Sequence, residues 1–403
     1  TSPFFHLPHR IQYLIHHYDK QICPVLVTKD GTDNPYRRHI LTLALRNACL
    51  QNAVAALSAN NIRMRLQSCN SLLYTAHSPS QLTNPAALAE ERLYRQTSIN
   101  QLNKHLSRPD TAQDDSVLAT LPILCLFHVS QSGFCHFQSQ LLGVQTLLRL
   151  RRVSMKRSTE TSAWVQLFFT WLDVMTSALN DREVQLHSNF SSNDVGTLEL
   201  FSGCDRTLFA LIERLGTANL LAQGRAVKRS LGAWTGNEVG YPDARTEFWG
   251  EWEDIVTKLN GWEGASGDRD IWHLNELYRY GALLYLTRLA NPGLSSADEK
   301  FQGLVGRAMR HVTALGLGSC VNKFLLWPLF MVGTECTDGG QRSEIRRRCV
   351  GIQMESGFYN NLSGLGVLER VWRGQSESGS SNKAHQSRIE KKNLPKGRRN
   401  VGY

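Results

Sequence analysis

Apolar residues recur every three or four positions along most of this 403-residue chain, which is the spacing of amphipathic helices. One such stripe ends before Pro24 and consists of Ile11, Leu14, Ile15, Tyr18 and Ile22. The strict alternation of apolar and polar residues that marks a half-buried strand is not found. The sequence therefore predicts an all-α fold, a multi-helix array of packed antiparallel helices with no sheet.

The same spacing predicts further helices along the chain. Two in succession are expected over 34–65, with Leu43, Leu50, Val54 and Leu57 in the core. The other predicted helices span residues 86–107, 113–133, 134–152, 162–180, 205–223, 246–260, 270–290, 297–316 and 367–374. Because only a short turn separates 113–133 from 134–152, we expect these two to be antiparallel neighbours.

Polar segments divide the predicted helices into two groups. Residues 180–196 are rich in Asn and Ser, and residues 231–243 hold three glycines and a proline. Such composition is typical of loops. We therefore expect an N-terminal helical part over 1–180, a C-terminal helical part over 181–374, and a basic tail over 375–403.

The segment 325–336, "LLWPLFMVGTEC", places a proline inside an apolar run. A proline within a helix removes a backbone hydrogen bond and costs about 3 kcal/mol, so it marks a boundary or a kink. Burial of Trp327 and Phe330 beside Pro328 is expected to offset this backbone cost.

Half of the formal charge of +10 lies near the C-terminus. Residues 375–403 hold seven Lys or Arg against two Glu, a net charge of +5, without apolar periodicity. A basic segment of this kind can contact nucleic acid, acidic partners or a nuclear-import receptor. Its composition favours the simpler interpretation of a disordered, solvated tail.

Nine cysteines are spread singly along the chain, and no C-x-x-C pair occurs. This excludes zinc ribbons, zinc fingers and thioredoxin-like redox sites, and it indicates free, mostly buried thiols in a reducing compartment. No apolar run of about 18 residues could span a bilayer, and the sequence shows no secretory leader. Because the chain begins at Thr1 and not at Met, we expect it to be part of a longer protein.

Terpene cyclases are all-helical enzymes that bind magnesium through two acidic stretches, and both stretches are incomplete here. "DDSVL" has Asp114 and Asp115 but Leu118 in the third carboxylate position, and "NDVGTLELF" has Phe201 where a closing Glu belongs. Leu and Phe cannot bind magnesium, so Asp114 and Asp115 are interpreted as the N-terminus of a helix. Common catalytic motifs such as G-x-S-x-G and H-E-x-x-H are also missing, and no enzyme is predicted.

One cluster of soft metal ligands remains, formed by Cys125, His128, Cys135 and His136. Cys125 and His128 lie one helical turn apart and could share a face of the helix, which is the geometry that a metal site needs. All four are embedded in apolar sequence, where core thiols and a hydrogen-bonded histidine are the commoner outcome. We therefore predict no metal and no other cofactor in this chain.

Several stretches, in order, resemble the fungal-specific transcription factor domain, the helical regulatory region of fungal binuclear zinc cluster regulators. They are "HHYDKQICPVL", "ILCLFHVSQSGFCHFQSQLLGVQTLLRLRR", "ELFSGCDRTLFALIERL", "LYRYGALLYLTRL", "LLWPLFMVGTEC" and "SGFYNNLSGLGVLERVWRG". The similarity spans about residues 9–374. The six-cysteine zinc cluster of the family cannot be assembled from these nine cysteines, so zinc is expected only in an upstream segment.

The resemblance implies a regulatory domain that controls RNA polymerase II transcription in the nucleus. Its implied partners are the transcription machinery or coregulators, a second copy of the chain, DNA through an upstream segment, and a small apolar effector. Trp327, Phe330 and Met331 are the candidate pocket residues, although aromatic stripes at helical spacing more often fill a core. The alternatives are a zinc-cluster-free scaffold or corepressor and, more remotely, a terpene-cyclase-like enzyme.

Overall fold

The computed structural model describes residues 3–73, 84–132, 137–153, 159–186, 195–225, 227, 243–264 and 267–375. Every regular element among these residues is a helix, so the predicted all-α fold without a sheet is confirmed for them. Most of the predicted break at 231–243 and all of the tail beyond residue 375 lie outside the described residues.

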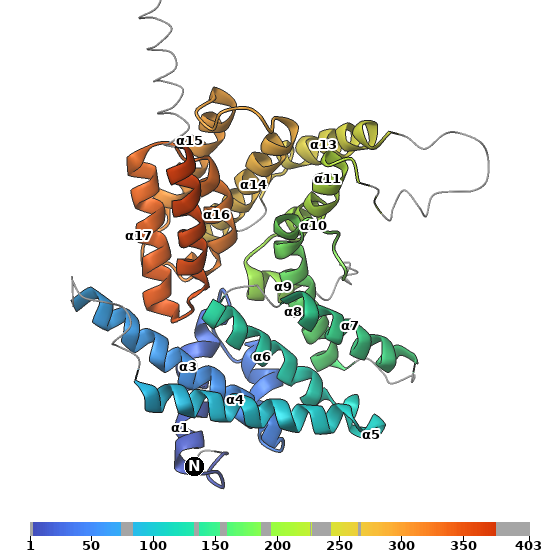
Figure 1. The fold of residues 1–403 in the computed structure, drawn as a ribbon, viewed down its shortest axis with the longest axis vertical. Coiled ribbons are helices and arrows are strands. Elements are labelled where there is room, and N and C mark those ends of the chain that lie inside the picture. Colours follow the sequence, from blue (N-terminus) through green and yellow to red (C-terminus); the bar gives the residue numbers. More distant parts are fainter. Residues whose placement is uncertain are drawn as a thin grey trace, which may run out of the picture.

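The N-terminal layer is built around one long helix, α3 (Ala48–Leu73), shown in blue in Figure 1. It packs against α1 (His9–His17), α4 (Pro85–Leu106) and α6 (Asp115–Ser132). The shorter helical segments of this layer are η1 (Tyr18–Ile22), η2 (Cys23–Leu26), η3 (Tyr36–Leu41), α2 (Thr42–Ala44) and α5 (Pro109–Ala112). The first predicted helix thus reaches Pro24 as expected, but its last turns change from α to π and 3-10 geometry.

The middle of the chain continues with helices that lie between the two ends of the molecule (Figure 1). They are α7 (Phe137–Val153), α8 (Glu160–Ser177), η5 (Ala178–Asn180), α9 (Val195–Ser202), α10 (Arg206–Glu213) and α11 (Leu215–Ala222). The single helix predicted over 205–223 is therefore wrong, because it is broken at Arg214. At Gly216 a Cβ would lie 2.8 Å from the backbone oxygen of Arg182, so the chain makes a close contact there that a side chain would prevent.

The C-terminal helices, in yellow to red in Figure 1, pack around α14 (Arg269–Ala290). The others are α13 (Ala244–Asn260), α15 (Glu299–Ala314), η7 (Asn322–Phe324), α16 (Leu326–Glu335), α17 (Gly339–Ser356) and a last helix over 360–375. α14 contacts α13, α15 and α16 directly. α17 also contacts α3, so the C-terminal helices pack against the N-terminal layer.

Aspartates start many of these helices. The helices α10, α13, α14, α15 and α17 each follow an aspartate whose carboxylate accepts a hydrogen bond from a main-chain N–H of the first turn: Asp205, Asp243, Asp268, Asp298 and Asp338. These N–H groups have no acceptor within the helix, so the carboxylate provides one. Its negative charge also interacts favourably with the positive end of the helix dipole.

One large hydrophobic cluster draws residues from both predicted parts of the chain. Leu50, Val54 and Leu57 are fully buried in it, as predicted, and Leu43 packs against it. Leu277 and Phe301 join the same cluster from the C-terminal helices. The division at residue 180 stays a prediction.

Pro328 lies in the first turn of α16, which begins at Leu326. The predicted boundary is therefore confirmed, but the expected backbone cost does not arise. The N–H groups of a first helical turn have no acceptor within the helix, so a proline there removes nothing. Because the proline costs no backbone hydrogen bond, the burial of Trp327 stabilises the packing of α16 in full.

Substitution of Gly357 by alanine is expected to destabilise the protein by about 1–2 kcal/mol or more. Gly357 ends α17 with φ at 72°, and an added Cβ would lie 2.6 Å from Nδ2 of Asn61. That amide donates to the carbonyl of Ser356 at 2.8 Å, so the clash would break the contact between α3 and α17.

The midpoint of urea-induced unfolding measures this effect. Gly351, inside α17 with open space around it, provides the matched control. Gly351→Ala is expected to raise stability by about 0.5–1 kcal/mol, because alanine is the better helix former. Equal shifts for the two variants would contradict the assigned role of Gly357.

Candidate functional site

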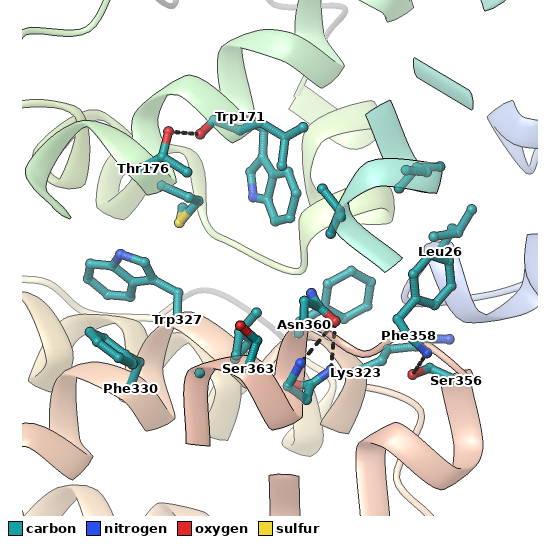
Figure 2. Close-up of a pocket in the computed structure, with 18 of the residues that line it drawn as sticks. Leu26, Trp171, Thr176, Lys323, Trp327, Phe330, Ser356, Phe358, Asn360 and Ser363 are labelled. Carbon is teal, nitrogen blue, oxygen red and sulfur yellow. Dashed lines mark hydrogen bonds between the residues drawn. The ribbon is translucent and has the colours of Figure 1, made fainter. Parts of the chain in front are cut away.

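A cavity of about 340 Å³ lies where the N-terminal helices face the C-terminal ones. Figure 2 shows Trp171 on α8 in one wall and Trp327, Phe330 and Ser363 in the wall opposite. η2 closes one end through Leu26. Segments from widely separated parts of the sequence therefore surround one space.

Aromatic rings make up much of the cavity wall. The rings of Trp171 and Phe201 meet edge to face with centroids 5.4 Å apart, and those of Tyr278 and Trp327 stack at 5.9 Å. Such pairs prefer these geometries and hold each other in place. A space of this size with mostly apolar walls and few polar groups is typical of small-molecule binding sites.

The three candidate pocket residues lie in two different environments. Trp327 and Phe330 line the cavity. Met331 points into the core beside α14, where its Cβ is 3.3 Å from the position that a Cβ on Gly281 would take. The pocket role of all three stays a prediction.

Polar groups are few in this wall, and some have no partner among the described residues. The indole N–H groups of Trp171 and Trp327 are buried without an acceptor. The side-chain oxygen of Asn361 is likewise buried without a donor, while its amide donates to the Oδ1 of Asn360 at 3.1 Å. Buried polar atoms left unpaired in this way destabilise a fold unless water or a ligand pairs with them.

Lys323 brings the one described ammonium group that lines the cavity. Its Nζ donates to the backbone carbonyl of Pro24, 299 positions earlier in the chain. Burial lowers the pKa of Lys323 below its usual value, because the charged form is poorly solvated there. Electrostatic interactions with Cys320 and then with Glu355 and Asp30 oppose this lowering of the pKa without cancelling it.

Sequence reasoning missed the α8 wall and Lys323. A signal for α8 was present, because the segment 164–175, "WVQLFFTWLDVM", is apolar on every side and so must contact other elements all round. Nothing in the sequence pairs this segment with Lys323, because the two line the same cavity only in the folded chain.

Of the four candidate metal ligands, the structure describes Cys125 and His128. Cys125 is fully buried, and burial raises the pKa of its thiol well above the usual value, so it stays protonated and is a poor metal ligand. Cys135 and His136 lie outside the described residues. The side chains of seven cysteines are described; all seven are free thiols, and all but Cys320 are buried, as predicted.

The acidic pair Asp114 and Asp115 is confirmed as a helix start, because α6 begins at Asp115. The carboxylate of Asp115 pairs with Arg151 at 2.8 Å and accepts from the hydroxyl of Thr159 at 2.9 Å. Phe201, in the other acidic stretch, is buried in the cavity wall. The carboxylate of Asp115 is thus occupied by structural partners.

The described helices form a packed array around one apolar cavity. The chain belongs to the fungal-specific transcription factor domain family, whose model matches residues 12–386, and it has a regulatory role in transcription. Comparisons with curated proteins and with solved structures gave no match. No helix in the described part of the chain is both long and apolar enough to cross a bilayer.

Proposed function

We propose that this chain is the effector-sensing and protein-interaction domain of a fungal regulator of RNA polymerase II transcription, acting in the nucleus. The cavity between the two groups of helices carries this proposal. A ligand in the cavity would contact both α8 and α16, so it can stabilise one arrangement of these two helices relative to another. Transcription machinery or coregulators would then recognise the altered surface.

We also propose that the domain catalyses no reaction and binds no metal or other cofactor. Among the described residues, the cavity wall holds one lysine and a few hydroxyl and amide groups but no His, Asp, Glu or Cys, which are common catalytic residues. Zinc-dependent DNA reading would require a segment outside residues 1–403, because these nine cysteines contain no C-x-x-C pair.

Filling the cavity is expected to abolish ligand binding. Ser363 lines the space, and its hydroxyl has no described partner, so Ser363→Trp places an indole in the cavity. The wild-type chain should bind the neutral fluorescent probe N-phenylnaphthylamine with increased emission, and Ser363→Trp should not. Arg370→Trp, at an exposed position of the same helix, is the control and should bind like the wild type.

The transcriptional part of the proposal is tested by fusing residues 1–403 to an unrelated DNA-binding domain in a fungal host. The fusion should change reporter transcription severalfold relative to the DNA-binding domain alone, and Ser363→Trp should alter that output while Arg370→Trp does not. An unchanged reporter would contradict the regulatory proposal. If fusions carrying either variant repress the reporter equally, relative to the DNA-binding domain alone, a corepressor scaffold would be favoured instead.

A further inference from the structure

Lys323 is partly buried and forms no ion pair with a carboxylate among the described residues, whereas two other partly buried cations do. Arg182 pairs with Asp173, and Arg63 pairs with Glu91 at 2.8 Å. The ammonium group of Lys323 donates to the carbonyl of Pro24 and lies over the ring of Phe324, 5.9 Å from its centroid, although it can donate three hydrogen bonds. A partly buried charge with neutral partners alone is incompletely stabilised.

The nearby acidic groups cannot supply the missing charge. Both carboxylate oxygens of Asp30 are used by Arg37, and one of them also accepts from Asn34. Glu355 is exposed and forms no ion pair with Lys323. Among the described residues, Lys323 therefore lines an apolar cavity without a paired carboxylate.

We propose that the cavity binds an amphipathic carboxylate, whose apolar body lies among the aromatic rings and whose head group pairs with Lys323. This inference rests on the proposed effector-binding function and names its ligand class. A single cation suits a monovalent anion, and the scarcity of polar groups in the wall disfavours a sugar or a nucleotide. Figure 2 shows Lys323 beside Asn360 and Phe358, next to the space that the body of the ligand would fill.

Pairing with the ligand would also offset the burial of Lys323. Desolvation lowers its pKa in the empty cavity, and a bound carboxylate would favour the charged form. The anion is therefore expected to bind at neutral pH with the lysine protonated, through a charge-assisted hydrogen bond.

Displacement of N-phenylnaphthylamine by decanoate, decanol and decylamine tests the proposal, because these three probes share one apolar chain and differ in head-group charge. Lys323→Met keeps most of the apolar stem and removes the charge. It should weaken decanoate binding about tenfold or more, the value of one charge-assisted hydrogen bond, while decanol changes by less than about twofold. Lys323→Arg should retain the preference for decanoate.

Lys300→Met, which removes an exposed lysine on α15, should leave all three affinities unchanged. Equal effects of Lys323→Met on decanoate and decanol would overturn the assignment of the head group. So would a wild type that binds decylamine or decanol in preference to decanoate. If the wild type does not bind the neutral probe at all, the effector-binding function itself fails, and the present inference with it.

Discussion

Asp173→Ala is expected to lower the free energy of unfolding by about 3–5 kcal/mol, the usual cost of breaking a buried ion pair by removing one partner. Asp173 lies on α8 with no exposed surface, and its carboxylate pairs with Arg182. It also accepts from the main-chain N–H groups of Gln185 and Leu186, at 2.6 and 2.8 Å. Alanine would leave a buried guanidinium and two buried N–H groups without this acceptor.

The same carboxylate ties the chain after η5 to the helix that forms one wall of the cavity. Loss of Asp173 should therefore weaken N-phenylnaphthylamine binding as well as stability. Urea unfolding followed by circular dichroism measures the stability change. Glu160→Ala is the control. The side chain of Glu160 is 74% exposed and that of its partner Arg38 is 55% exposed, so this ion pair should contribute less than about 1 kcal/mol to stability. Similar losses for the two variants would contradict a structural role for Asp173.

Arg348→Met is expected to cost about 3 kcal/mol, because several buried acceptors lose their donor at once. Arg348 on α17 is 3% exposed and donates to the backbone oxygens of Val312 and Leu315, at 2.8 and 2.5 Å. These carbonyls lie at the end of α15, where the helix leaves them unpaired and where positive charge is favoured. A further donation, at 3.0 Å, reaches Oδ1 of Asn322 in η7.

Arg347→Met provides a control from the adjacent position. Arg347 pairs with Glu344 at the surface, so its loss should cost less than about 1 kcal/mol. Arg348→Lys should recover only part of the lost stability, because lysine lacks the planar fork that serves several acceptors together. Since η7 also carries Lys323, Arg348→Met should weaken decanoate binding in the displacement assay, and Arg347→Met should not.

Helix positions were predictable from the sequence because they depend on residues close together in the chain. Aspartates at helix starts, the proline of α16 and the spacing of Leu50, Val54 and Leu57 are all local signals. The break between α10 and α11 was not predictable, because the apolar spacing continues across Arg214. The π turn after α1 likewise had no signal in the apolar stripe, which continues through it.

The all-α class and the family follow from the sequence, since helical periodicity and an ordered set of short motifs are properties of the chain alone. The sequence also identified Trp327 and Phe330 as aromatic residues that are either buried in the core or line a pocket. The folded structure shows that they line a cavity together with residues of α8 and with Lys323. The reason is physical: Lys323 and Pro24 are 299 positions apart, and no local preference determines which distant surfaces pack together.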